Sequence, residues 1–147
     1  MLGLSLAIIS CAEGQKTANK EEANTPGQPV AEQPVAQETT ILKVLSNDEF
    51  VSMQEETTDL QIVDVRTPRE VAQGVIPGAI HINIQDADFV ERMEQLDKSK
   101  PVVVYCAAGG RSARASQQLE DKGFTAIYDL TGGFSKWSSE GRPIQKD

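Results

Sequence analysis

Short apolar runs alternate with amphipathic stretches along the chain from Ile41 to Asp147. The apolar runs are rich in β-branched residues and predict buried strands at residues 41–45, 60–65, 79–84, 101–105 and 126–130. Apolar residues at helical spacing, together with capping residues, predict helices within residues 46–53, 67–74, 86–98, 113–122 and 132–137. This alternation predicts an α/β domain with a central, mostly parallel sheet of about five strands, flanked by helices.

The composition is different before Ile41. Residues 12–40 contain three prolines, many Glu, Gln, Ala and Thr residues and no aromatic residue, so little of this stretch could pack. We therefore predict a disordered spacer over residues 12–40 and one folded domain over residues 41–147.

Residues 1–11 form a separate apolar segment, which is too short to span a bilayer as a helix. Its end, Ile8-Ile9-Ser10-Cys11, resembles a bacterial lipobox, in which the cysteine is lipidated and becomes the mature N-terminus. The sequence departs from that pattern because no Lys or Arg precedes the apolar run, and a frayed apolar terminus is the alternative. The resemblance implies an exported lipoprotein of the bacterial periplasm or cell envelope, anchored to the membrane through Cys11.

The chain carries a net charge of −8. Nucleic acid is not an expected partner, because phosphate binding needs a basic face. The sequence has two cysteines, Cys11 and Cys106, and one histidine, His81, with no Cys or His at metal-ligand spacing from Cys106. We therefore expect no structural disulfide, no metal and no other cofactor, while a relay between His81 and Cys106 depends on where the histidine points.

Cys106 is the candidate nucleophile because it follows the most hydrophobic predicted strand, at the sheet edge where parallel strands bind ligands. The loop after it can wrap main-chain N–H groups around an anion before it enters a helix; it comprises Ala107, Ala108, Gly109, Gly110, Arg111 and Ser112. Lowering a thiol pKa from about 8.5 to about 7 requires about 2 kcal/mol of preferential thiolate stabilisation, which a helix dipole and one Arg can supply. The alternative is a buried, inert core cysteine.

Several separated motifs resemble the rhodanese family over residues 41–147. The loop that begins at Cys106 is similar to the family pattern C-x-x-G-x-R-S, whose cysteine carries a persulfide. Residues 74–79 resemble the family's G-H-I-P-G-A turn with Val75 in place of histidine, and residues 130–137 resemble its closing L-x-G-G-x-x-x-W element. The resemblance implies a three-layer rhodanese-like domain.

The family's D-x-R…E element resembles Asp64, Arg66 and Glu70. The full resemblance implies a thiosulfate sulfurtransferase, in which a Cys106 thiolate takes sulfur from thiosulfate or a similar donor and passes it to a thiol or cyanide acceptor. The loop N–H groups and Arg111 would bind donor and persulfide, Arg66 would help to orient the donor, and the two acidic residues would support Arg66. We expect a monomer that acts on small molecules.

Other functions stay open at this point. One is a non-catalytic rhodanese module that relays sulfur, binds a partner or reports redox state through an exposed thiolate of low pKa. Another is a phosphatase or arsenate reductase, although these related enzymes use C-x-x-x-x-x-R, one residue longer than the span from Cys106 to Arg111. The shorter loop predicts a smaller pocket, suited to a sulfur atom over a phosphate.

Overall fold

The computed structural model describes residues 39–146. The predicted export segment with Cys11, and nearly all of the predicted spacer, lie outside the described residues. Strands and helices alternate along the described part, in the order β1 (Ile41–Leu45), α1 (Asn47–Glu56), β2 (Gln61–Asp64), α2 (Pro68–Val71), β3 (Ala79–His81), α3 (Phe89–Met93), β4 (Val102–Tyr105), α4 (Gly110–Asp121), β5 (Ala126–Leu130) and α5 (Gly133–Ser139).

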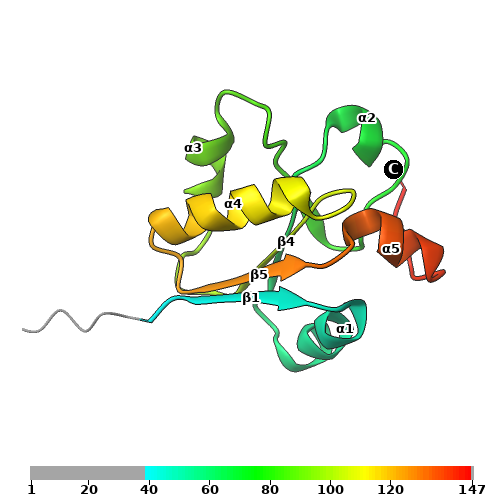
Figure 1. Ribbon diagram of the computed structural model, residues 1–147, viewed down its shortest axis with the longest axis horizontal. Helices are drawn as coiled ribbons and strands as arrows, with labels where there is room; N and C mark the ends of the chain where they lie inside the picture. Colours follow the sequence, from blue (N-terminus) through cyan, green and yellow to red (C-terminus); the bar gives the residue numbers. More distant parts are fainter. Residues whose placement is uncertain (1–38, 147) are drawn as a thin grey trace, which may run out of the picture. The chain divides into compact units, whose positions relative to one another are not determined.

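The five strands form one parallel sheet in the order β1-β5-β4-β2-β3. Strand β4 lies in the middle, where Val104 is in register with Val63 of β2 and with Asp129 of β5. Because all strands run the same way, their carboxyl ends meet at one edge of the sheet (Figure 1). The prediction of a parallel sheet of about five strands is confirmed.

Helices cover both faces of the sheet, so the domain has the predicted three layers (Figure 1). Helices α3 and α4 pack on one face over a core that includes Val63, Val102, Val104, Met93, Leu119 and Ile127. Helices α1 and α5 pack on the other face over a core that includes Ile62, Val103, Tyr105, Phe50, Leu130 and Trp137. No helix within residues 39–146 has the length and apolar composition of a membrane span.

Strand β3 and helix α3 are among the elements that are shorter than predicted, and side-chain contacts explain where each of the two ends. Strand β3 ends at His81 because the side-chain oxygen of Asn83 accepts a hydrogen bond from the N–H two residues later and turns the chain (3.1 Å). Helix α3 stops well before Lys98 because the Gln61 side chain bonds both to the Asp97 carbonyl (2.8 Å) and to its N–H (2.9 Å). These contacts hold residue 97 outside the helix.

The first turns of α1 and α2 agree with the sequence. Ser46 caps α1, where its side chain accepts from the Glu49 N–H (3.3 Å) while the Glu49 carboxylate accepts from the Ser46 N–H (2.8 Å). Pro68 opens α2, and the Glu70 carboxylate accepts from the N–H (3.0 Å) and the hydroxyl (2.6 Å) of Thr67. The second arrangement fixes the position of Glu70.

Residues 143–146, which we name the C-terminal strap, lie against the turn that follows α2. Val75 and Gln145 exchange two main-chain hydrogen bonds in an antiparallel bridge (2.8 and 2.9 Å). Gly74 has a φ of 125°, and a Cβ at this position would lie 2.3 Å from the Ile144 Cγ2 atom. The close packing of the strap therefore depends on glycine at position 74.

Candidate active site

Cys106 lies immediately after β4, the central strand, on the sheet face that α4 covers. The residue is only 2% exposed and packs within the same core as Val104 and Ala115. The exposed thiolate that the redox-reporter alternative requires is therefore not present in this state of the protein. The apolar run that makes β4 a buried strand also draws the residue that follows it into the core.

Main-chain N–H groups are directed at the buried sulfur. The Gly109 N–H donates to Cys106 Sγ at 3.0 Å, and the Ser112 hydroxyl lies 3.7 Å from the same atom. Burial raises the pKa of the Cys106 thiol, but the N–H groups of Ser112, Gly109 and Ala108 outweigh burial, so the net pKa lies below its ordinary value. The buried sulfur is thus not in an inert, purely apolar environment.

Helix α4 begins closer to the sulfur than predicted. It starts at Gly110 rather than at Ala113, because Gly109 adopts a φ of 111° and its carbonyl accepts from the Ala113 N–H (3.0 Å). Glycine and serine have low helix propensity, which made residues 110–112 look like a loop in the sequence. The structure places them in the first helical turn, where their N–H groups can face an anion.

Helix α5 orients the loop from the opposite side. The Phe134 N–H donates to the Cys106 carbonyl (2.8 Å), and the Ser135 N–H donates to the Ala107 carbonyl (3.0 Å). Because the C=O and N–H of one peptide point in opposite directions, the bond to the Ala107 carbonyl turns the Ala108 N–H away from α5. The Ala108 N–H is one of the groups that lower the Cys106 pKa. Gly133 allows this approach, since a Cβ there would lie 2.2 Å from the Cys106 carbonyl oxygen.

The sequence predicted that Gly133 and Phe134 belong to a short helix within residues 132–137, and gave no indication that they contact the cysteine loop. The available signal was the pair of adjacent glycines, Gly132 and Gly133, before a short helix. Both have positive φ, at 72° and 53°. Adjacent glycines indicate either a left-handed backbone conformation or a close approach of two main-chain segments. Gly133 has the left-handed conformation and also allows α5 to approach the cysteine loop.

Arg111 stands at the rim of the loop and is already paired. Its guanidinium binds both carboxylate oxygens of Glu70, at 2.5 and 2.8 Å. The Arg111 hydrogen bonds hold the pKa of Glu70 at about 2. The pKa of Arg111 is raised, mainly by Glu70 and to a smaller extent by the Cys106 thiolate. The positive charge therefore faces both the carboxylate and the sulfur.

Arg66 and Asp64 form a buried ion pair, with side chains 2% and 0% exposed and Nη2 2.6 Å from a carboxylate oxygen. Arg66 also donates to the carbonyls of Gly74 (2.7 Å) and Glu70 (3.3 Å), and its guanidinium lies 3.9 Å from the centroid of the Phe134 ring. Each guanidinium nitrogen thus has a protein acceptor. A contact between Arg66 and the sulfur donor stays a prediction. Because the hydrogen bonds of Arg66 go to other parts of the protein, the geometry favours a structural role for Arg66 in the site.

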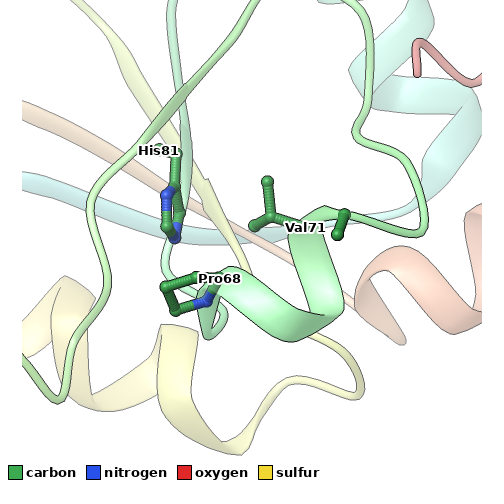
Figure 2. A pocket seen from close by; sticks show the side chains of 4 residues that line it. Pro68, Val71 and His81 are labelled. Carbon is green, nitrogen blue, oxygen red and sulfur yellow. The ribbon is translucent and has the colours of Figure 1, made fainter. Parts of the chain in front are cut away.

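His81 bonds elsewhere than to Cys106. Its Nε2 atom lies 2.8 Å from the Arg66 carbonyl, which can only accept, so Nε2 carries the hydrogen. The ring lines a surface pocket of about 340 Å³ together with Pro68, Val71 and Ala72 of the α2 region (Figure 2). Nε2 is therefore unavailable as a base for Cys106.

Comparison with known proteins gives a consistent picture. The family described as "Rhodanese-like domain" matches residues 46–140. A sulfurtransferase from Allochromatium vinosum is 38% identical over 89 residues, which cover 60% of this chain and 81% of the relative. The YtwF protein of Bacillus subtilis is 36% identical over 102 residues, which cover 69% of this chain and 96% of the relative.

Solved structures have the same fold. The crystal structure of a rhodanese-like domain protein from Staphylococcus aureus matches with a TM-score of 0.63 and 31% sequence identity. The match covers 71% of this chain and 98% of that protein. From its sequence, its five-stranded parallel sheet and its cysteine loop, the chain belongs to the rhodanese-like domain family.

Proposed function

We propose that the protein is a sulfurtransferase in which Cys106 carries the transferred sulfur as a persulfide. The observation on which the proposal depends is the Gly109 N–H directed at Cys106 Sγ, within a loop whose N–H groups lower the thiol pKa. Such a thiol has a larger thiolate fraction at neutral pH than a free cysteine, and the thiolate is the nucleophilic form. The sulfurtransferase from Allochromatium vinosum supports this class of reaction.

The first step loads the sulfur, and we propose thiosulfate or a similar compound as the donor. The Cys106 thiolate attacks the outer sulfur, a new S–S bond forms, the donor's own S–S bond breaks, and sulfite leaves with the electron pair. The negative charge then lies on the outer sulfur of the persulfide. The loop N–H groups around Gly109 would stabilise this charge without any rearrangement of water.

The second step unloads the sulfur. A nucleophilic acceptor, cyanide in an assay or a thiol in a cell, attacks the outer sulfur of the persulfide. The S–S bond to Cys106 breaks, and its electron pair returns to Cys106 as a thiolate. With cyanide the product is thiocyanate, and no proton or external electron is needed in either step.

Arg111 is the proposed contact for the anionic donor. Its guanidinium is bidentate with Glu70 in the resting structure, so the donor must share it or replace the carboxylate. Thiosulfate has two negative charges and competes well with one carboxylate. Since Cys106 is only 2% exposed, we propose that release of Arg111 from Glu70 also opens the way to the sulfur.

The test uses the full chain and thiosulfate, followed by cyanide. The protein should gain the mass of one sulfur atom on Cys106 and then release thiocyanate, whereas Cys106→Ser should do neither. Loading without thiocyanate release would support a relay module instead. Equal activity in wild type and Cys106→Ser, or turnover of a phosphate ester without sulfur transfer, would contradict the proposal.

We also propose that the protein is an exported bacterial lipoprotein, on the basis of the sequence around Cys11 alone. Lipidation of Cys11 would anchor the domain to the membrane through the spacer. Metabolic acyl labelling and detergent-phase partitioning of wild type and Cys11→Ala test the proposal. An unlabelled wild-type protein in the aqueous phase would contradict it.

A further inference from the structure

Strand β1 is the edge strand of the sheet, next to β5 (Figure 1). The Ile41 N–H donates to the Thr125 carbonyl at 2.8 Å, at the start of the pairing with β5. Because the main-chain groups of alternate residues point to opposite sides of a strand, every second residue from Ile41 faces β5, while Leu42 and Val44 face outward. The edge therefore offers the N–H and C=O groups of these two residues to another strand.

The side chains of β1 are unusually apolar for an edge strand. Of the five large apolar side chains that are exposed within residues 39–146, three belong to β1: Ile41 (49%), Leu42 (45%) and Val44 (60%). Proline, charged residues and a short strand commonly protect an edge from pairing. Strand β1 contains no proline, and its one charged residue, Lys43, binds Glu49 at 3.0 Å. This edge therefore has the features of a surface that binds an extended segment.

A pocket of about 150 Å³ adjoins Leu42 and Val44, and residues of β1, α4 and β5 line it. Two of the lining residues have a buried polar atom without a hydrogen-bond partner within the described residues: Oδ1 of Asp129 and Oγ of Ser116. Ser116 is 2% exposed. Since buried polar atoms in folded proteins nearly always have partners, these two indicate a ligand that brings hydrogen-bond donors.

Asp129 gives the pocket a negative charge. It lies in β5 in register with Val44, so both side chains point to the sheet face that α4 covers. None of the ion pairs within residues 39–146 involves Asp129. Burial raises the pKa of Asp129, and an interaction with Ser112 offsets only part of the increase. A cation in the pocket would replace the water that the carboxylate loses.

The size of the pocket fits a lysine side chain. One water takes about 30 Å³ of liquid volume, so the pocket has room for about five non-hydrogen atoms, as in the four carbons and one nitrogen of lysine. A strand added to β1 would lie about 4.8 Å outside it, and hence about 9.6 Å from β5. A lysine beside Val44 on the added strand and the Asp129 side chain together span this distance.

Charge distinguishes the possible sources of the added strand. A second copy of the chain has a net charge of −8. Residues 12–40, which precede β1, contain two Lys and five Glu, so their net charge is −3. Both would bring more negative charge to Asp129, whereas a basic segment of another protein brings the opposite charge.

We propose that the outer edge of β1 is a docking site for an extended, basic segment of another protein, which adds a strand to the sheet and places a lysine in the pocket against Asp129. Leu42 and Val44 supply main-chain hydrogen bonds and apolar contacts. Asp129 and Ser116 accept from the lysine ammonium and so select it. The inference is independent of the proposed function, because the docking site uses neither Cys106 nor its loop.

The test measures binding of a labelled, capped peptide, Val-Thr-Lys-Thr-Val, to the full chain by fluorescence anisotropy. Wild type should bind it about ten-fold more tightly than the matched peptide Val-Thr-Gln-Thr-Val, since a hydrogen-bonded charge is lost. This comparison leaves the protein unchanged and so does not depend on the folding of a variant. Asp129→Asn should remove the preference for lysine, whereas Asp121→Asn, at the exposed last residue of α4, should keep it.

The use of the strand edge is tested at Val44. Val44→Pro removes an outward N–H and should abolish binding of both peptides, whereas Val44→Thr keeps this N–H and should bind the lysine peptide. No binding to wild type at millimolar peptide, equal affinity for the two peptides, a lysine preference that survives Asp129→Asn, or unchanged binding by Val44→Pro would each overturn the proposal.

Two further results would assign the edge to a different occupant and overturn the proposal in that way. One is a dimer of the wild-type chain that Val44→Pro abolishes, because it would assign the edge to a second copy. The other is tighter binding of the lysine peptide by Lys16→Gln/Lys20→Gln than by wild type, because it would assign the pocket to the lysines of residues 12–40.

Discussion

Gly133→Ala is the most direct test of how α5 shapes the cysteine loop. The added Cβ would lie 2.2 Å from the Cys106 carbonyl oxygen and 2.9 Å from the carbonyl carbon and oxygen of Ala107. All three atoms belong to the main chain, so no side-chain rotation can relieve the overlap. Either α5 or the loop must move.

The cost has two parts. Gly133 has a φ of 53°, and a residue with a Cβ in this left-handed region costs about 1–2 kcal/mol. Overlap with a well-packed neighbour adds about 1–3 kcal/mol. We therefore expect Gly133→Ala to lower the free energy of unfolding by about 2–5 kcal/mol. If the loop moves, the hydrogen bond from the Phe134 N–H to the Cys106 carbonyl breaks. The loop N–H groups then no longer point at the sulfur, and the Cys106 pKa rises because these groups lower it in the wild type.

Gly123→Ala is the matched control. Gly123 also has a positive φ, at 84°, but a Cβ there meets no atom within 4 Å. Urea unfolding should show a loss of about 1–2 kcal/mol for this variant, the backbone part alone. Thiolate absorbance should show a raised Cys106 pKa only in Gly133→Ala. An equal loss of stability in the two variants, with an unchanged Cys106 pKa in both, would refute the argument.

Two further predictions concern the carboxylates near the loop. Asp64→Asn leaves the charge of Arg66 buried without its counter-ion, and urea unfolding should show a loss of about 3–5 kcal/mol. Glu70 has a folded-state pKa of about 2 against an ordinary 4.5, so its pairing with Arg111 stabilises the fold above about pH 4.5, and this contribution is lost as the pH falls toward 2. Between about pH 4.5 and pH 2, the unfolding free energy of Glu70→Gln should therefore fall less than that of the wild type. The KM of Glu70→Gln for thiosulfate should be lower than that of the wild type, because Arg111 is no longer paired with a carboxylate.

The sheet could be predicted because its strands are buried on both faces and therefore appear as continuous apolar runs, as in Val102-Val103-Val104. Helix ends were predictable where the cap is local, as at Ser46. The end of α3 was not predictable, because Gln61, far away in the chain, binds Asp97 and holds it outside the helix. Local sequence patterns cannot reveal contacts of this kind.

The candidate site also has one part that local sequence predicts and another part that depends on contacts between distant residues. Cys106 and its loop are contiguous, so the composition of the segment alone indicated a cradle for an anion. The pairing of Arg111 with Glu70, 41 residues away, and the approach of Gly133 to the loop depend on how helices meet at the sheet edge. The burial of Cys106 also depends on this packing, and the sequence left a buried cysteine only as an alternative.

The C-terminal strap has a practical consequence for anyone who manipulates the protein. The strap lies against Gly74, and the Gly74 carbonyl accepts a hydrogen bond from the buried Arg66 guanidinium (2.7 Å). Gly74 therefore links the strap to the buried ion pair of Arg66 and Asp64. We expect a purification tag fused after Asp147, or proteolytic trimming there, to disturb the packing of the strap against Gly74. Tags and fusion partners are better placed between Cys11 and Ile41, far along the chain from the strap.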